Sequence, residues 1–274
     1  MTSLRRPAAG DGLVRGAMLL LVSNDDGIDA PGIEVLARAL APLGQVMVVA
    51  PSTERSAQSH ALTMHEPLRV SERAPGRFAC SGQPADCVYL GVHHLCATRP
   101  TAVISGINRG SNLGDDVHYS GTVGAAEEAA LMGIPALAVS LHPDRANAPD
   151  HHWQTAAELA VRVLRAMVAD PLPPRVFLNL NVPDRPLDQV PGIRAAALGR
   201  REYQPMVAES RDPRGREYYW VGGAPLAFDQ TEGTDGYWFS RGFATLTPLH
   251  PDHTHRATLD RLSRWTALGP ETPG

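Results

Sequence analysis

The chain has 274 residues, of which 43% are hydrophobic and 20% are charged, a balance typical of a globular protein. The formal net charge is −4, which excludes a broad basic surface for duplex nucleic acid. The sequence contains no lysine, so a Schiff-base lysine and the lysine of a Walker phosphate loop are excluded as well. The first apolar run, residues 19–22, is far too short to cross a membrane, and no membrane partner is expected.

Residues 1–16 contain arginines but no apolar core followed by a cleavage site. We interpret them as a disordered leader rather than a signal peptide. The three cysteines, Cys80, Cys87 and Cys96, are odd in number and have no CxxC spacing. They indicate small buried residues of a reduced protein, and the cytoplasm is the expected location.

Residues 19–50 are expected to form a strand, a helix and a second strand. Residues 19–22 and 45–50 are short apolar runs, and apolar side chains recur at helical spacing between Ile33 and Leu43. A βαβ unit of this length predicts a parallel sheet with a right-handed crossover. Further strands are expected at 68–70, 77–80, 101–104, 134–140, 176–182, 193–198, 217–221 and 243–247. Further helices are expected at 87–95 with Asp86 as N-cap, at 123–133 with Ser120 as N-cap, at 153–167 with Asp150 as N-cap, and at 256–268.

Two adjacent carboxylates, Asp25 and Asp26, follow the first strand and precede Gly27. Two acids at the end of a buried strand are costly unless a positive charge neutralises them. A divalent cation at the carboxyl edge of the sheet, where open α/β sheets place their ligands, would account for the pair. An Asx-type turn with both acids in solvent is an equally good interpretation of these residues alone.

Polar residues also follow the second and third strands. Ser52, Thr53 and Ser56 come after the second strand, and Asn108 offers an amide oxygen to a hard cation after the third. Neighbouring parallel strands end at one edge, so these side chains are expected near the acidic pair. Ordinary polar surface loops are the alternative interpretation of the same residues. The segment 120–122 opens a small-residue helix whose free N–H groups suit a phosphate; a plainly capped helix is the alternative.

Taken together, the motifs resemble SurE, the survival protein family of metal-dependent acid phosphatases that act on nucleoside monophosphates. The matching stretches are SNDDG at 23–27, APSTERS at 50–56, GQPADCVYLG at 82–91, SGINRGSNLGDDVHYSGTVGAA at 105–126 and GIPALAVSL at 133–141. The match resumes at 177–183, 234–235 and 247–249, and is poor over the leader, 144–150 and 185–216.

The resemblance implies an α/β fold: a three-layer α/β/α, Rossmann-like, mostly parallel sheet with a C-terminal β-rich arm exchanged between subunits. A homodimer or homotetramer is therefore expected. The corresponding division is a leader at 1–16, a catalytic core at 17–184, a β-rich oligomerisation arm at 185–258, and a helix and tail at 259–274.

The resemblance also implies one divalent cation per subunit, Mg²⁺ or Mn²⁺. Its expected ligands are Asp25, Asp26, Ser56 and Asn108, an all-oxygen set that suits a hard cation better than zinc. The expected reaction is hydrolysis of nucleoside 5′-monophosphates, with 3′-monophosphates as a second substrate type, by a water that the metal activates.

Asp25 and Asp26 are the expected catalytic residues, and the phosphate is expected to bind Asn24, Asn112, Ser120, Gly121 and Thr122. An aspartyl-phosphate intermediate is less favoured, because a metal-bound carboxylate is a poor nucleophile. A broad phosphomonoesterase or exopolyphosphatase, and a nucleotide-binding module without activity, are the alternative functions.

The remaining expectations concern a few polar residues outside the ligand set. Asn181 is expected to line the pocket, and the resemblance places Asp235 near the active centre. His93 and His94 are assigned surface or packing roles. The cluster of His250, His253 and His255 resembles a metal motif, but a solvated loop is the preferred interpretation.

Overall fold

The structure, a computed structural model, describes residues 18–143, 150–223 and 225–265. The predicted leader and the last residues of the predicted terminal helix and tail lie outside this part of the chain. Among the described helices, none combines the length and the apolar character that crossing a bilayer needs.

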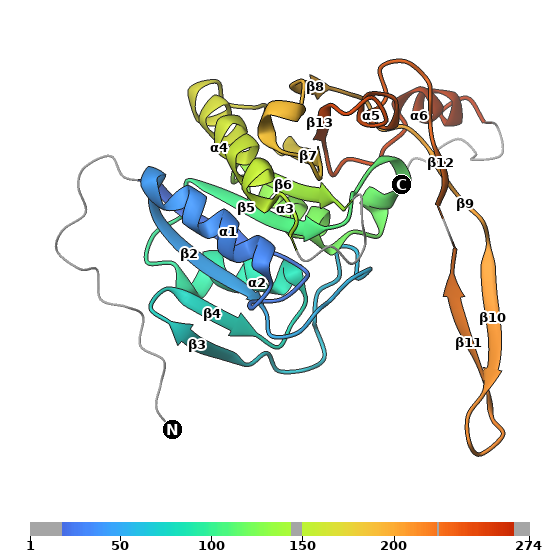
Figure 1. The fold of residues 1–274 in the computed structure, drawn as a ribbon, viewed down its shortest axis with the longest axis horizontal. Helices are drawn as coiled ribbons and strands as arrows, with labels where there is room; N and C mark the ends of the chain where they lie inside the picture. Colours follow the sequence, from blue (N-terminus) through green and yellow to red (C-terminus); the bar gives the residue numbers. More distant parts are fainter. Residues whose placement is uncertain (1–17, 144–149, 224, 266–274) are drawn as a thin grey trace, which may run out of the picture.

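A nine-stranded sheet organises the molecule, in the order β3-β4-β2-β1-β5-β6-β7-β13-β8 (Figure 1). The strands from β4 to β7 are parallel, β3 and β13 run antiparallel to their neighbours β4 and β7, and β8 is parallel to β13. This confirms the predicted mostly parallel sheet. The bounds are β1 Met18–Ser23, β2 Gly44–Pro51, β3 Val70–Ala74, β4 Arg77–Cys80, β5 Ala102–Arg109, β6 Ala136–His142, β7 Phe177–Pro183, β8 Ile193–Ala195 and β13 Ala244–Leu249.

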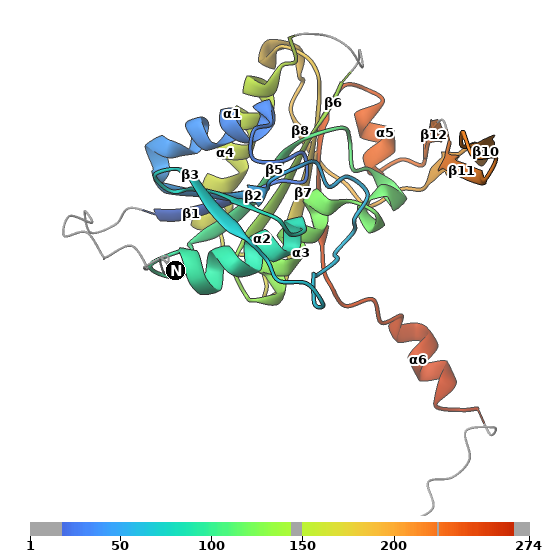
Figure 2. The ribbon, with the colours of Figure 1, turned by 90° about the horizontal axis from the view of Figure 1, so that it is seen from below.

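Helices cover both faces of the sheet, which confirms the three-layer α/β/α architecture (Figure 2). The helices α1 (Pro31–Leu40) and α4 (Trp153–Ala169) pack on one face, and α2 (Pro84–Leu90) and α3 (Gly121–Leu131) pack on the other. Ile33, Leu36 and Leu40 of α1 are buried, as their helical spacing predicts. Short helical segments lie at η1 Ala41–Leu43, η2 Gly91–Leu95, η3 Gly114–His118 and η4 Leu187–Gln189.

Two of the three predicted N-caps are wrong. In α2 the N-cap is Gln83, and Asp86 lies inside the first turn, where its carboxylate accepts the Gln83 amide at 2.7 Å. Pro84 takes the first helical position, which needs no donor, and so moves the start upstream. The N-cap of α4 is His152 rather than Asp150. Ser120 is confirmed as the N-cap of α3, since its hydroxyl accepts the Val123 amide at 3.1 Å.

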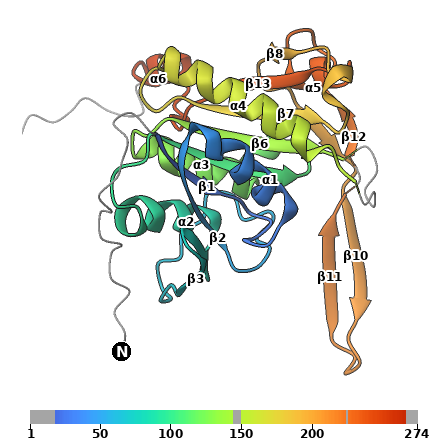
Figure 3. The ribbon, with the colours of Figure 1, turned by 60° about the vertical axis from the view of Figure 1, so that its left-hand side comes forward.

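The chain after β7 extends the sheet and then leaves it. The strands β8 and β13 belong to the central sheet, so part of the predicted segment 185–258 extends that sheet. The predicted division of the chain stays a prediction. A hairpin of β10 (Met206–Arg211) and β11 (Glu217–Gly222) projects from the body, and every residue of its two strands is exposed (Figures 1 and 3). At its base β9 (Arg201–Tyr203) pairs with β12 (Pro225–Phe228). The helix α5 (Asp235–Phe239) begins within the predicted loop 231–236, and α6 (Arg256–Leu262) comes after β13.

The smaller predictions about the body have mixed outcomes. All three cysteines are free and buried, and His93 and His94 are exposed. The predicted helix 87–95 is instead the end of α2 followed by a π-helical turn, η2. Subunit exchange of the arm stays a prediction.

Candidate active site

The ends of β1, β2 and β5 meet at one edge of the sheet. Register pairs Ser23 of β1 with Ser105 of β5, and Val22 of β1 with Val48 of β2. The loops after these strands contact one another through the backbone: the Arg55 amide donates to the Asp25 carbonyl at 2.7 Å. The structure therefore brings the polar loops after these three strands together at the predicted edge.

Asp25 is buried against the first turn of α3. Its carboxylate accepts a short hydrogen bond from the Thr122 hydroxyl, and only 4% of the residue is exposed. A Cβ at Gly121 would lie 2.9 Å from the Asp25 Cβ, so only glycine lets the helix begin this close. Burial raises the pKa of Asp25 to about 7, with a smaller upward contribution from Asp26, while the hydrogen bond from Thr122 acts in the opposite direction.

Asp26 lines a cavity at the same edge of the sheet. Its carboxylate accepts the Arg109 amide at 3.0 Å. Burial raises the pKa of Asp26 despite this bond and the positive charge of Arg109. The cavity has a volume of about 710 Å³, and Asp26 shares its lining with Ser56 from the loop after β2.

The remaining expected metal ligands lie at the same edge with different surroundings. Ser56 is exposed and donates its hydroxyl to Glu54 Oε1 at 2.8 Å. Asn108 donates its amide nitrogen to the Gly110 carbonyl at 2.8 Å, an orientation that directs its amide oxygen away from that carbonyl. Hard cations bind oxygen atoms in proteins. The four expected ligands offer such oxygens: two carboxylates, a hydroxyl and an amide.

Asn24 closes the turn that carries the acidic pair. Its amide nitrogen donates to the Gly27 carbonyl at 2.9 Å, and its amide oxygen accepts the Gly27 amide at 3.2 Å. Both atoms of the side-chain amide are thus engaged within the turn. These bonds give Asn24 a role in shaping the turn. A contact between Asn24 and phosphate stays a prediction.

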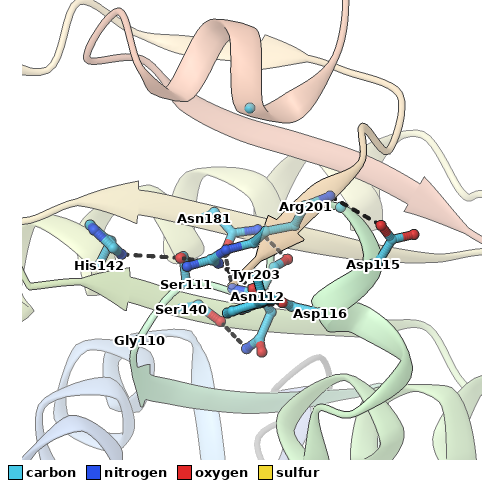
Figure 4. A network of polar contacts seen from close by, with 12 residues as sticks. Gly110, Ser111, Asn112, Asp115, Asp116, Ser140, His142, Asn181, Arg201 and Tyr203 are labelled. Atoms are coloured by element: carbon cyan, nitrogen blue, oxygen red, sulfur yellow. Dashed lines mark hydrogen bonds and ion pairs between the residues drawn. The ribbon is translucent and has the colours of Figure 1, made fainter. Parts of the chain in front are cut away.

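Asn112 is fixed by polar side chains of β6 and β7 (Figure 4). Its amide nitrogen donates to Ser140 Oγ at 2.7 Å, and its backbone amide donates to Asn181 Oδ1 at 2.7 Å. Its carbonyl accepts from the amides of Asn179 and Asn181 at 2.8 and 3.1 Å. Asn181, expected to line the pocket, therefore holds the Asn112 backbone in place, and Ser140 and Asn179 are site residues that the sequence analysis missed.

The base of the projecting arm also contacts the loop that carries Asn112 (Figure 4). The Arg201 side chain, 7% exposed, forms an ion pair with Asp116 and donates to Ser111 Oγ at 3.3 Å. The Tyr203 hydroxyl donates to Asp116 Oδ1 at 2.5 Å, and the Arg201 amide donates to Asp115 Oδ2 at 3.0 Å. Arg201 and Tyr203 lie far along the chain from the loop that they contact, so no short motif in the sequence signalled these contacts.

Asp235 fastens the same loop from a second direction. One carboxylate oxygen accepts the Gly114 amide at 2.8 Å, and the other accepts the Gly199 amide at 2.9 Å. The residue is buried at 1% exposure. Asp235 thus joins the loop after β5 to the segment before β9. One of its contacts, with Gly114, lies two residues from Asn112, so its role here is structural.

The histidine cluster beyond β13 does not converge on one point. The His250 ring accepts the Asp252 amide at 2.9 Å, and the His255 ring lies 2.5 Å from Thr258 Oγ1. The His253 ring instead faces His118, with centroids 6.2 Å apart. Within the described ranges, no group of three or more His, Cys, Asp or Glu side chains is placed to hold a metal, so a metal at the acidic pair would need the hydroxyl and amide oxygens.

Comparison with known proteins identifies the same family that the sequence motifs resemble. A family profile described as Survival protein SurE matches residues 20–205. The 5′-nucleotidase SurE of Geobacter metallireducens is 50% identical over 248 residues, which cover 90% of this chain and 97% of that protein. Its namesake from Syntrophotalea carbinolica is 51% identical over 249 residues, or 91% of this chain and 98% of that protein.

A solved structure has the same fold. The crystal structure of the SurE protein from Aquifex aeolicus matches with a TM-score of 0.79 at 34% sequence identity, and the match covers 92% of this chain and 100% of that one. The profile spans more than half of the chain, and it includes the acidic turn, the loop after β5 and the start of α3. The chain belongs to the SurE family.

Proposed function

We propose that this protein hydrolyses nucleoside monophosphates to nucleoside and phosphate, with 5′-monophosphates as the main substrates. The observation that carries the proposal is the acidic pair at the end of β1, one member of which touches the N-terminal turn of α3. Relatives at about half identity over most of the chain are named 5′-nucleotidase SurE, which supports the same reaction here.

The donor atoms at this edge fit a divalent cation, Mg²⁺ or Mn²⁺. Burial raises the pKa of both Asp25 and Asp26, so a cation beside the pair would stabilise its ionised form. Asp25, Asp26, Ser56 and Asn108 would hold the ion. When bound, it would supply positive charge to the phosphoryl group and lower the pKa of a water.

The chain's own groups orient this site. The Thr122 hydroxyl and the turn closed by Asn24 fix the two carboxylates. The positive end of the α3 dipole and its first amides favour a phosphate, and Asn112 would present its amide to the phosphate oxygens. Because Ser140 and Asn181 already hold Asn112, this donor would need little reorganisation during the reaction.

Two properties of the whole protein belong to the same proposal. We place it in the cytoplasm, because its three buried cysteines are free, as in a reduced protein. We also propose a homodimer or homotetramer, because the projecting hairpin exposes aromatic side chains that a neighbouring subunit would cover.

Phosphate release from AMP, GMP, ribose 5-phosphate and a short polyphosphate, with Mn²⁺ or with EDTA, tests the proposal. We expect release from the nucleotides with Mn²⁺ and none with EDTA. Polyphosphate as the preferred substrate would favour exopolyphosphatase activity. No phosphate release under any metal condition would favour a nucleotide-binding module without activity.

Asp25→Asn and Asp26→Asn test the site itself. Each is expected to lower turnover at least about 100-fold and to weaken Mn²⁺ binding in calorimetry, since each removes a charged ligand. Asp170→Asn, an exposed carboxylate at the end of α4, is the control and should behave as wild type. Turnover retained in both site variants would remove the assignment.

A further inference from the structure

The cavity beside Asp26 continues past the acidic edge to a wall that the proposed chemistry does not use. This wall contains His151 and Trp153, from the segment that enters α4. The Trp153 ring packs against Gly32 at the start of α1, where a Cβ would lie 3.1 Å from the indole. The His151 and Trp153 rings meet edge to face, with centroids 5.6 Å apart and an interplanar angle of 82°. The lining of one cavity therefore includes acidic side chains as well as two aromatic rings.

His151 is held by a buried carboxylate. Its Nδ1 lies 2.6 Å from Asp184 Oδ2, and the two side chains are 7% and 6% exposed. Burial alone would raise the pKa of Asp184, but hydrogen bonds from the His152 amide and from both imidazoles outweigh it and hold the pKa below its ordinary value. Asp184 is thus an ionised acceptor, and His151 Nδ1 must be the donor.

This arrangement leaves the second ring nitrogen of His151 without a role in the fold. His151 Nε2 is buried, and no hydrogen-bond partner for it exists in the part of the chain that the structure describes. A buried polar atom without a partner costs free energy, and such atoms gather where a ligand completes the bonding. With a proton on Nδ1, the imidazole ring presents Nε2 as an acceptor.

A second histidine, His152, binds the same carboxylate. The His152 amide donates to Asp184 Oδ1 at 2.7 Å, and the His152 ring lies 2.9 Å from the same oxygen. The His152 side chain is 39% exposed and does not line the cavity. Of the two histidines on this carboxylate, only His151 is placed at the cavity wall.

We propose that Trp153 and His151 form the subsite for the nucleoside half of the substrate, an inference that rests on the proposed function. The Trp153 ring offers a flat apolar surface to the base, and His151 Nε2 accepts a hydrogen bond from a nucleoside N–H or O–H group. Stacking of bases on aromatic side chains is favourable and tolerant of base identity. The cavity, about 710 Å³, lies within the range of small-molecule sites.

The test compares a substrate that has a base with one that lacks it. With Mn²⁺ present, Trp153→Leu is expected to raise KM for AMP about tenfold and to leave kcat/KM for ribose 5-phosphate within about twofold. Trp153→Phe, which keeps an aromatic ring, should recover most of the affinity for AMP. Trp265→Leu, just after α6, removes an exposed ring that does not line the cavity and should change the kinetics with neither substrate.

The histidine pair supplies a matched control. His151→Gln is expected to raise KM for AMP several-fold and to weaken competitive inhibition by adenosine, which has no phosphate. His152→Gln should leave both values unchanged, although both variants remove a hydrogen bond to Asp184. Far-UV circular dichroism and the melting temperature establish that each variant is folded.

The outcomes separate the subsite from the reaction. Equal losses for AMP and ribose 5-phosphate in Trp153→Leu would overturn the subsite while leaving a metal-dependent phosphatase. No turnover by the wild type with Mn²⁺ would overturn the proposed function. Calorimetric titration of AMP into wild type and Trp153→Leu would then still decide whether the subsite exists, since equal affinities would refute it.

Discussion

Asp25 is a carboxyl group whose position is unfavourable without a partner of positive charge. It is nearly inaccessible to water, and burial raises its pKa to about 7 from an ordinary value of 3.8. In the metal-free protein the folded state therefore binds this proton more tightly than the unfolded state does. The contribution of this proton to the free energy of unfolding is complete below the pKa of Asp25 in the unfolded chain. It is lost as the pH rises through the pKa of Asp25 in the folded protein.

This sign gives a prediction for the metal-free protein. In EDTA, the free energy of unfolding should fall between about pH 4 and about pH 7, by at most about 4 kcal/mol from Asp25. Asp25→Asn should show a smaller fall, and Mn²⁺ should restore the wild type above neutral pH. Urea unfolding at a series of pH values measures this, and an identical pH slope in wild type and Asp25→Asn would contradict it.

Residue chemistry was predictable from the sequence where it is local. Asp25, Asp26 and the Ser120 cap can be read from short stretches of chain whose strand ends and helix start are marked by composition. Ser140 and Asn179 were not predictable, because they lie inside apolar strands and become site residues only through the register of β6 and β7. His151 was missed for a related reason, since its partner Asp184 lies after another strand.

At the scale of elements, the loop between β5 and α3 is held by parts of the chain from beyond β7. The ion pair between Arg201 and Asp116 is largely buried, with side chains 7% and 13% exposed. Burial raises the pKa of Asp116 in spite of the hydrogen bond from Tyr203 and the charge of Arg201. The attraction therefore does not fully offset the cost of desolvation, and loss of either partner leaves an unpaired buried charge.

We predict that Arg201→Gln and Asp116→Asn each lower the free energy of unfolding by about 3 kcal/mol. The double variant should be destabilised by clearly less than the sum, because no unpaired charge remains. Urea unfolding of the wild type, the two single variants and the double variant completes this double-mutant cycle. Strict additivity would mean that the two side chains are not coupled.

We also expect Arg201→Gln to raise KM for AMP, since the loop that Arg201 holds in place carries Asn112.

Long elements were predicted well and short ones poorly. Apolar runs identified the core strands, and helical spacing identified α1 and α4, because each pattern repeats several times. The helix α3 was identified from its small residues after the Ser120 cap. The strand β9 has three residues and α5 has five, too few for any period to be visible. Both exist because of tertiary contacts: β9 pairs with β12, and the Asp235 carboxylate at the start of α5 accepts amides from two distant loops.

At the scale of the molecule, the exposed hairpin is the clearest sign of association. Every residue of β10 and β11 is exposed, and Trp220 and Val221 are 68% and 85% accessible. An isolated two-stranded hairpin is marginally stable in water. A neighbouring subunit would supply the missing packing, as the family resemblance also implies.

We expect the wild type to be a dimer or tetramer in light scattering coupled to size exclusion. Replacing residues 206–222 by a short Gly/Ser linker should lower the mass toward that of one chain and leave the melting transition of the central sheet in place. A monomeric wild type, or a shortened chain of unchanged assembly, would refute the role of the hairpin.

The position of β13 has a topological consequence. It lies between β7 and β8, although the hairpin separates it from both in the chain. A protease that nicked the hairpin turn would produce two fragments, and the later one would remain wedged between two strands of the earlier one. Such a nicked protein should stay in one piece until it is denatured, so a cut chain on a denaturing gel need not mean a dismantled enzyme.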